Sequence, residues 1–473
     1  MTSSPTFKPA LILHGGAGAI HRSTLPPDLY AKYHSSLLSY LRSTKRLLED
    51  GAHAIDAAVH AVSLMEDDEL FNCGRGSVFT SAGTIEMEAS VMVTSARSEN
   101  SVTNNSDSMK RGAGVICVRN VRHPIQLAKE VLVRTGQDEN GNPVPGDDEG
   151  QDNGSMHSQL SGPYVEELAR GWGLEFKPDE WFWTQKRWDE HQRGLRKPNC
   201  EYTSGPGLGL GHGYPSQGTV GCVCLDQWGD LAVATSTGGL TNKFPGRVGD
   251  TPTLGAGFWA EAWDVEGRNS TGQLEDMRYH PQMAQPPFRT SGSSKSIWDM
   301  TLVDCMPDLS PLFRDTFGAE PDTDMRTRSP PGEPFTDRKP KPLRPRKKRR
   351  AAAVSGTGNG DSFLRTAAAR TTCAMMRFSK QTVSLSKAIS AVAGADGELQ
   401  RSAGRRWGKT GEGQGGIIGI EAVLDEDTID ESGLHRGKVA FDFNCGGMFR
   451  AWIEEDVDGR DIEHVMVFKE PYR

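Results

Sequence analysis

The chain has 473 residues, a length typical of two or three domains, and a formal net charge of −8 at pH 7. This acidic balance argues against a protein that binds nucleic acid over its whole surface. No apolar stretch is long enough to span a membrane, and the apolar run at the N-terminus is too short for a signal peptide. The eight cysteines lack metal-ligand spacing. We therefore expect a cytoplasmic protein with free thiols.

The first segments predict helices packed on a sheet. A short apolar strand, residues 10–13, runs into the glycine-rich turn His14–Gly18, which has neither the glycine spacing nor the Lys-Ser/Thr pair of a nucleotide site. Between residues 29 and 66 apolar side chains recur at helical spacing, and Gly51 divides the pattern into two helices. The second helix is rich in alanine, which allows it to approach a sheet closely.

The next segments alternate between regular elements and polar chain. The acidic stretch 66–69 lacks the ligand spacing of an EF-hand calcium loop. We expect strands at 85–92 and 114–121 and an amphipathic helix at 123–134. The composition of residues 136–161 shifts to Gln, Asp, Asn, Gly and Pro, which predicts an exposed insertion.

Residues 216–257 concentrate hydroxyl side chains and glycines around one Arg/Asp pair. Thr219 begins an apolar strand, residues 227–230 suit a hairpin turn, and a second strand ends at Thr237, so the two threonines should lie close together. A lone threonine here is most often an ordinary first residue of a strand. As a nucleophile it needs a base, and cleavage of the Gly218–Thr219 bond would supply one, the α-amine of Thr219.

The segment from about residue 264 to 350 is rich in Pro, Ser, Arg and Asp and shows no convincing periodicity. Because such a composition cannot bury enough apolar surface to fold, we expect a disordered insertion. Its basic end, Arg338–Arg350, is typical of a nuclear-localisation or nucleic-acid patch and also of a solvated loop. The core resumes with Thr357-Gly358, a helix expected over 362–378, and two further strands.

Several motifs carry a resemblance to a known family. GTVGCVC, LAVATSTGG, PGRVGDTP and GAG stand at unbroken spacing between residues 218 and 257, and FNCGGMFRAW follows near the C-terminus. They resemble the plant-type asparaginase and isoaspartyl peptidase family, whose members are self-cleaving hydrolases with an N-terminal threonine nucleophile. The resemblance covers most of residues 10–260 and 351–455. It implies an α/β fold, the four-layer αββα sandwich of Ntn hydrolases.

The resemblance also implies the roles of the central residues. Cleavage after Gly218 would make Thr219 the nucleophile and new N-terminus, and Thr237 would polarise it. Arg247 would bind the α-carboxylate of the substrate and Asp250 its α-ammonium group. This assignment is physically reasonable because a planar guanidinium binds a carboxylate in a forked geometry and a nearby Asp supplies the opposite charge.

Further roles follow from the same resemblance. Thr357 and Gly358 would contact the substrate and form the oxyanion hole, which stabilises charge on the carbonyl oxygen during amide cleavage. Asn72 would lie near the nucleophile. The loop Glu66–Arg75 would wrap a structural sodium ion, and no other cofactor is required. The main-chain carbonyls expected to bind this ion are those of Glu66, Phe71, Cys73 and Arg75.

Self-cleavage would divide the protein into an α chain, residues 1–218 with a mobile tail at about 200–218, and a β chain, residues 219–473. This αβ heterodimer would assemble as (αβ)2. The expected substrates are L-asparagine and β-aspartyl dipeptides. Glycosylasparaginase and taspase-like endopeptidase activities are alternatives, although the pair Arg247 and Asp250 favours small zwitterionic substrates. A catalytically dead nuclear binding protein that uses the basic run Arg338–Arg350 is the non-enzymatic alternative.

Overall fold

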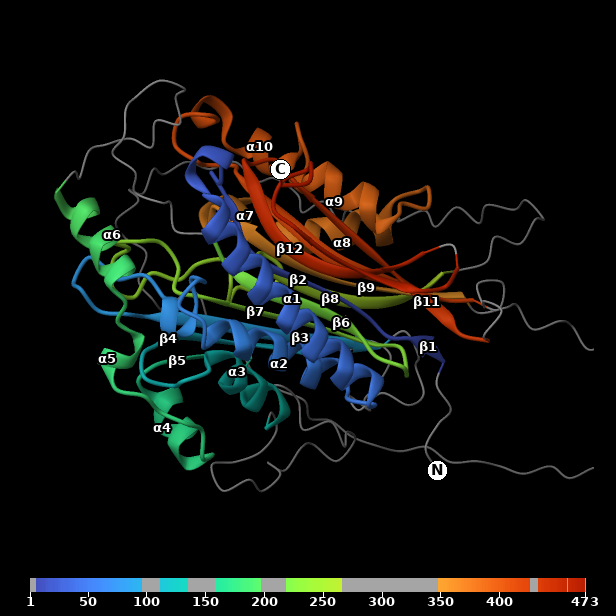
Figure 1. Cartoon of the computed structure of the whole chain (residues 1–473). Helices are drawn as coiled ribbons and strands as arrows, with labels where there is room; N and C mark the ends of the chain where they lie inside the picture. Colours follow the sequence, from blue (N-terminus) through green and yellow to red (C-terminus); the bar gives the residue numbers. More distant parts are fainter. Residues whose placement is uncertain are drawn as a thin grey trace, which may run out of the picture. The chain divides into compact units, whose positions relative to one another are not determined.

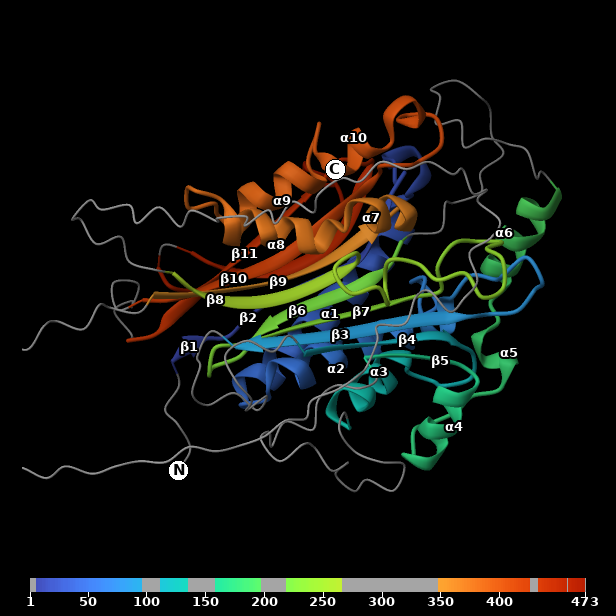
Figure 2. The same cartoon turned by 180° about the vertical axis from the view of Figure 1, so that it is seen from behind.

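The computed structural model describes residues 6–95, 111–134, 158–196, 218–265, 348–425, 433–456 and 458–472. All of them belong to one unit, which combines Met1–Gly267 with Arg346–Arg473. They form two sheets and the helices that cover them (Figures 1 and 2). The mixed α/β fold expected from the sequence is therefore confirmed.

The larger sheet has eight strands. In chain order they are β2 (Ala10–Gly18), β3 (Met87–Ser95), β4 (Arg111–Val118), β5 (Gln159–Ser161), β6 (Val220–Leu225), β7 (Asp230–Thr237), β12 (Gly447–Glu455) and β13 (Asp461–Met466). Their order across the sheet is β13-β12-β2-β6-β7-β3-β4-β5. Strand β6 lies between β2 and β7 near the centre of the sheet, and every residue of β6 is buried because the sheet is covered on both faces.

The smaller sheet has five strands. In chain order they are β1 (Phe7–Lys8), β8 (Phe258–Val265), β9 (Lys348–Gly358), β10 (Gly415–Leu424) and β11 (His435–Phe443), and across the sheet they run β1-β11-β10-β9-β8. A layer of apolar side chains from both sheets fills the space between them, including Ile12 and Val223 from the larger sheet and Ala353 and Ile418 from the smaller one. The two sheets therefore pack face to face.

Helices cover the outer face of each sheet (Figures 1 and 2). On the larger sheet lie α1 (Pro27–Glu49), α2 (Ala54–Glu66) and α3 (Pro124–Val133), and on the smaller sheet α8 (Ala368–Phe378) and α9 (Leu385–Ala393). The remaining helices are shorter or lie at the ends of the strands: α4 (Tyr164–Gly171), α5 (Asp179–Phe182), α6 (Gln185–Arg196), α7 (Gly360–Thr366), α10 (Glu398–Ser402), and the 3-10 turns η1 (Arg22–Thr24), η2 (Gly74–Gly76) and η3 (Gly404–Arg406).

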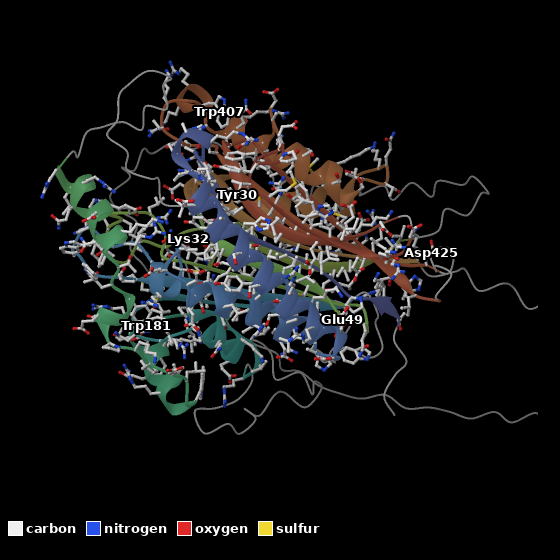
Figure 3. The ribbon with its side chains drawn as sticks, in the orientation of Figure 1. Tyr30, Lys32, Glu49, Trp181, Trp407 and Asp425 are labelled. Carbon is white, nitrogen blue, oxygen red and sulfur yellow. The ribbon has the colours of Figure 1, made fainter. Side chains whose placement is uncertain are left out.

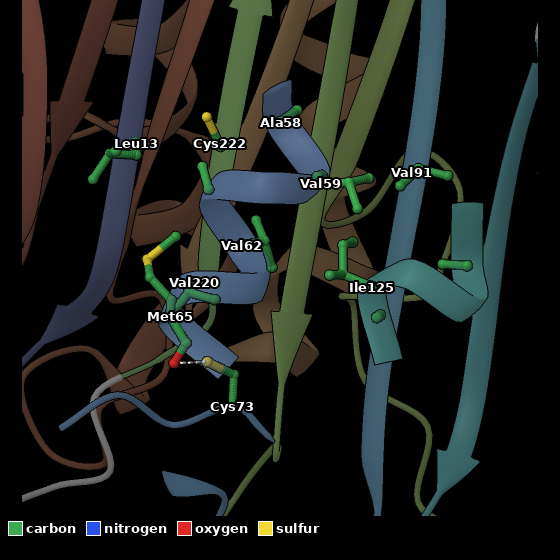
Figure 4. Close-up of a cluster of buried hydrophobic side chains, with 14 of the residues drawn as sticks. Leu13, Ala58, Val59, Val62, Met65, Cys73, Val91, Ile125, Val220 and Cys222 are labelled. Atoms are coloured by element: carbon green, nitrogen blue, oxygen red, sulfur yellow. Dashed lines mark hydrogen bonds between the residues drawn. The ribbon is translucent and has the colours of Figure 1, made fainter. Parts of the chain in front are cut away.

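The alanine-rich helix α2 packs directly on β6 and β7. Its small side chains at Ala57, Ala58 and Ala61 are fully buried, and Val62 and Met65 continue the same face (Figure 4). Figure 4 shows this face beside Cys222 of β6, which is buried as well. Because alanine keeps the helix close to the sheet, the helical spacing read from the sequence correctly identified both the helix and its packing face.

Strands from both sheets end or begin at one edge of the structure. Thr219 immediately precedes Val220, whose partner in β7 is Ser236, and Thr237 follows Ser236, so the expected hairpin places the two threonines at neighbouring register positions. In the smaller sheet, Gly358 at the end of β9 pairs with Gly415 at the start of β10. This edge, near α6 and α10 in Figure 1, carries the residues of the candidate site.

The boundaries of two predicted insertions were wrong. Residues 159–161, assigned to the polar insertion 136–161, form β5 and pair in parallel with β4. Residues 264–265 end β8 and residues 348–350 begin β9, so the insertion predicted over 264–350 is shorter at both ends. The remainder of both segments, and residues 200–217 of the predicted tail, lie outside the described residues.

The last three basic residues of the run Arg338–Arg350 belong to the folded core. Lys348 pairs with Asp425 at 2.9 Å and Arg349 with Asp264 at 3.1 Å. Arg350 is 5% exposed, forms an ion pair with the buried Glu421, and donates to the carbonyl of Val383 at 2.7 Å. Asp425 lies at the end of the sheets away from Trp407 (Figure 3). These three cations therefore have structural partners instead of forming an exposed basic patch.

The segment 362–378, expected as one helix, is two. Ala367 has φ of 44° and separates α7 from α8. The N–H groups of Ala369 and Arg370 at the start of α8 donate to the carbonyls of Ala256 and Gly255, at 3.1 and 2.8 Å. The break is therefore stabilised by a contact with a distant loop, which replaces the hydrogen bonds that a continuous helix would have made.

Two other expectations concern the whole chain. Within the described ranges, no helix combines the length and the apolar character needed to cross a membrane. Among the cysteines in those ranges, all are free thiols: Cys73, Cys117, Cys222, Cys224, Cys373 and Cys445.

Substitution of Arg350 by alanine should strongly destabilise the protein. The substitution leaves the Glu421 carboxylate buried without its cation, and such a loss typically costs about 3–5 kcal/mol. The free energy of unfolding should be measured by chemical denaturation, with the exposed Arg405→Ala as the control. A loss below about 1 kcal/mol, typical of an exposed pair, would contradict the structural role of Arg350.

Candidate active site

Thr219 lies at the start of β6 and is 5% exposed. Its hydroxyl oxygen is 2.9 Å from the hydroxyl oxygen of Thr251, which is fully buried. Its main-chain N–H donates to the hydroxyl oxygen of Thr357 at 3.0 Å. Both the side chain and the amide of Thr219 are therefore held by hydroxyl groups of other segments.

The hydroxyl oxygen of Thr357 accepts two main-chain hydrogen bonds. Besides Thr219, the N–H of Ala17 in β2 donates to it at 3.2 Å. Gly218, which precedes the nucleophile candidate, has φ of 37°, and a methyl group on its Cα would lie 2.3 Å from the Thr357 hydroxyl. Only glycine fits this left-handed and crowded position, so the peptide between Gly218 and Thr219 is confined beside Thr357.

Thr237 and Asn72 shape the loop that follows β7. The Thr237 hydroxyl accepts from the N–H of Gly239 at 3.0 Å. Asn72 is fully buried, donates to the carbonyl of Gly239 at 2.8 Å, and accepts from the N–H of Val78 at 3.1 Å. In this structure both side chains bind the main chain, so the polarising role of Thr237 and the role of Asn72 at the nucleophile stay predictions.

Arg247 and Asp250 lie against the segment that follows Thr357. A methyl group at Gly360 would lie 2.6 Å from Asp250 Oδ1 and 3.0 Å from Arg247 Nη2, so both side chains approach the same glycine. Arg247 Nη2 also pairs with Asp361 Oδ1 at 3.0 Å. Because Thr357 holds Thr219, the five residues from 357 to 361 bring the nucleophile candidate and the Arg/Asp pair into one site.

Asp250 is a buried carboxylate with an unsatisfied oxygen. It is 5% exposed, and its Oδ2 has no hydrogen-bond partner among the described residues. Burial raises its pKa to about 7, the nearby Arg247 opposes this shift, and the charges of Glu88 and Asp361 add to it. A buried carboxylate of this kind is suited to a cationic ligand such as an ammonium group.

His14 stands behind the nucleophile candidate without being a base for it. Its Nε2 is 2.7 Å from the hydroxyl oxygen of Ser355 in β9, which links the two sheets. Complete burial lowers the pKa of His14 to about 3, although its interaction with the main chain of Thr219 opposes the shift. A ring that stays neutral at physiological pH serves to hold the strands together.

The turn expected at His14–Gly18 was wrong, because these residues continue strand β2 and pair with β12, and the end of this strand packs against the loop 66–76. A methyl group at Gly15 would lie 2.4 Å from the ring of Phe71, which supports a packing role for this glycine. Methyl groups at Gly74 and Gly76 would lie 2.1 Å from the carbonyl oxygen of Glu66 and 2.0 Å from that of Phe71. These glycines therefore let the main chain of the loop pack closely on itself, and the cation site expected there stays a prediction.

Side chains contribute little to such a cation site. Glu66 Oε1 accepts from the hydroxyl of Ser236 at 2.6 Å and from the N–H of Ile125 at 3.1 Å, and burial raises the pKa of Glu66 well above its usual value. The Cys73 thiol donates to the carbonyl of Met65.

Among the described residues, the group with metal-ligand geometry is His53, Asp226 and Asp230, at the turn between β6 and β7. There, Asp226 accepts three main-chain N–H groups, which gives it a structural role.

Comparison with known proteins identifies the class to which this fold and site belong. The sequence profile of the asparaginase family matches residues 7–138 and 153–278, which is more than half of the chain. The chain therefore belongs to the asparaginase family, and the resemblance of its motifs is confirmed.

Individual relatives agree with the family match. The isoaspartyl peptidase of Escherichia coli (strain K12) is 35% identical over 54% of this chain and 68% of its own length, and that of Salmonella typhimurium is 34% identical over 54% and 70%. The isoaspartyl peptidase/L-asparaginase of Macaca fascicularis is 32% identical over 57% of this chain and 73% of its own length.

Three site residues were not identified from the sequence. Thr251 directly follows Asp250, so its place in the PGRVGDTP motif was a possible signal for its contact with Thr219. Asp361 lies in the segment after Gly358, but nothing in its local sequence indicates a contact with Arg247. Glu88, which accepts from the N–H of Gly249 at 2.9 Å, is 161 residues away from that partner.

Substitution of Asp250 by asparagine should stabilise the protein at alkaline pH. The pKa of Asp250 is about 7 in the folded chain against 3.8 for a free side chain, so the folded state binds the proton more tightly and stability falls as the pH rises from about 4 to 7. Above this range the buried charge costs on the order of 2–4 kcal/mol, which asparagine avoids.

The measurement is thermal unfolding of wild type and Asp250→Asn at pH 4 and pH 8, with the exposed Asp458→Asn as the control. The variant should have the higher melting temperature at pH 8, and the difference should shrink at pH 4. An equal or lower melting temperature of Asp250→Asn at pH 8 would show that the Asp250 charge is adequately compensated.

Proposed function

We propose that this chain is a self-cleaving amidohydrolase that acts on the side-chain amide of L-asparagine, on β-aspartyl (isoaspartyl) peptides, or on both, with Thr219 as the nucleophile. The observation that carries the proposal is the confinement of the Gly218–Thr219 peptide beside Thr357, in the same site as the Arg247/Asp250 pair. Family membership and the names of the relatives support it.

Activation begins with the hydroxyl of Thr219. Its oxygen attacks the carbonyl carbon of Gly218, the bond from that carbon to the Thr219 nitrogen breaks, and the nitrogen takes up the hydroxyl proton. Water then hydrolyses the resulting ester, which leaves a carboxylate on Gly218 and restores the hydroxyl. The freed α-amine of Thr219 can now act as the base for its own hydroxyl.

Hydrolysis of the substrate repeats this chemistry on an external amide. Arg247 binds the α-carboxylate and Asp250 the α-ammonium group, so the side-chain carbonyl is presented to Thr219. The Thr219 oxygen forms an ester with the aspartyl group, and ammonia or an amino acid leaves with the transferred proton. Thr357 and Gly358 stabilise the developing oxyanion. Water releases aspartate and regenerates Thr219.

The charged pair favours a small zwitterion over an internal peptide bond of a protein. Neither an α-carboxylate nor an α-ammonium group is present next to an internal aspartyl residue, so a taspase-like endopeptidase would leave both Arg247 and the buried Asp250 without partners. Release of ammonia from L-asparagine and cleavage of a β-aspartyl dipeptide are therefore the first activities to assay.

Other features of the proposal concern the architecture and the environment of the enzyme. The face-to-face sheets with helices outside them suit the four-layer αββα sandwich of Ntn hydrolases. The loop 66–76 is proposed to bind sodium through main-chain carbonyls, as the family resemblance implies. We further propose a cytoplasmic αβ heterodimer that assembles as (αβ)2.

Self-cleavage is tested by mass spectrometry and N-terminal sequencing of the purified chain. Wild type should yield fragments of 218 and 255 residues, the second of which begins with Thr219, whereas Thr219→Ala should stay intact. An intact wild-type chain that neither releases ammonia from asparagine nor cleaves a β-aspartyl dipeptide would refute the proposed function.

Thr357 should control the rate of self-cleavage. Valine has the same shape but cannot accept from Ala17 and Thr219, so Thr357→Val should misplace the peptide bond and slow cleavage on the order of 100-fold. Serine keeps the hydroxyl, and Thr357→Ser should retain most of the rate. The fraction of cleaved chain should be followed by gel electrophoresis over time, and equal rates for Thr357→Val and wild type would exclude this role.

A further inference from the structure

The guanidinium assigned to the substrate already has a carboxylate partner in the chain itself. Asp361 Oδ1 lies 3.0 Å from Arg247 Nη2, and the two side chains are 58% and 18% exposed. Asp361 stands in the first turn of α7, four residues after Thr357. Because a substrate α-carboxylate would bind the same guanidinium, it must share Arg247 with Asp361 or displace it.

We propose that Asp361 is a resident carboxylate that occupies Arg247 in the free enzyme and is displaced by the α-carboxylate of the substrate, so that it sets the affinity of the site. This inference rests on the proposed function. It adds to that function a side chain, Asp361, that competes with the substrate for Arg247.

The balance of charge around Arg247 supports displacement over sharing. Besides its partner Asp361, Arg247 approaches Gly249 together with Glu88 and Gly360 together with Asp250, and Lys243 is a further cation of this group within the described residues. A zwitterionic substrate adds no net charge and its ammonium group offsets Asp250, but its α-carboxylate comes to the guanidinium that Asp361 already occupies. The repulsion is relieved if one of the resident carboxylates moves away.

Asp361 is the resident carboxylate that can move. Glu88 is fully buried and Asp250 is 5% exposed, and Glu88 is also held by the N–H of Gly249. Asp361 is more than half exposed, so its charge can return to water at little cost. Its pairing with Arg247 is therefore weak enough to be replaced by a forked contact to a substrate carboxylate.

The ion pair between Asp361 and Arg247 would both order the Arg247 side chain and select among ligands. In the free enzyme it holds the long Arg247 side chain in place, which reduces the conformational entropy lost when substrate binds. A ligand that lacks an α-carboxylate cannot replace Asp361 on Arg247. The pair therefore favours ligands that carry this group, such as aspartate, over β-alanine, which is aspartate without it.

The test compares Asp361→Asn with wild type, both fully cleaved. Asparagine at 361 keeps the shape but not the charge, so aspartate should bind about two- to five-fold more tightly by calorimetry, as expected from the loss of an exposed ion pair. The effect should appear in KM for asparagine more than in kcat, and β-alanine binding should not change. Asp361→Glu keeps the charge and should bind aspartate much as wild type does.

Glu412→Gln is the matched control, because Glu412 pairs with Arg365, in the same helix as Asp361, at 3.4 Å and with Arg406 at 3.2 Å, and it forms no ion pair with Arg247 in the described part of the chain. It should leave aspartate affinity unchanged. Equal or weaker aspartate binding by Asp361→Asn, or an equal gain in Glu412→Gln, would overturn the competition. If the wild-type chain cleaves itself and binds aspartate, such a result would overturn the competition but not the proposed function. A wild-type chain that does neither would overturn both.

Discussion

One hydroxyl oxygen, that of Thr357, connects the two sheets at the site. It accepts from Ala17 at the end of β2 and from Thr219 before β6, which are neighbours in the larger sheet, while Thr357 itself belongs to the smaller one. The apolar layer between the sheets is not directional, so it does not by itself fix their relative position. The two directional hydrogen bonds to Thr357, together with the His14–Ser355 contact, align the sheets here, and the two at Thr357 lie at the peptide bond proposed to break.

The part of the site proposed to bind substrate contains charge that the fold does not neutralise. Asp250 has a buried oxygen without a partner, and Glu88 Oε2 is in the same state among the described residues. In a protein selected only for stability such groups would be replaced by apolar or amide side chains. Their presence next to Arg247 is understandable if a ligand with an ammonium group completes the set, which makes the site less stable when empty than when occupied.

The sequence was most informative where local pattern and long-range structure agree. Helical spacing predicted α1 and α2 with their division at Gly51, and the motifs around Thr219 predicted the hairpin and the family. It was least informative where a distant partner decides the outcome. The break at Ala367 depends on carbonyls of the loop at residues 255–256, and the burial of Arg350 depends on Glu421. Neither partner is visible in the local sequence.

The antiparallel pairing of β8 and β9 has a consequence for where this chain can accept inserted sequence. Val265 and Lys348 are paired neighbours, and the strand from Lys348 to Thr357 places them about 30 Å from the site. Because the chain leaves and re-enters the sheet at adjacent points, the entropic cost of closing the loop rises only slowly with its length. This end of the sheet can therefore accept long insertions far from the site. A fluorescent or affinity module inserted there should leave the fold intact.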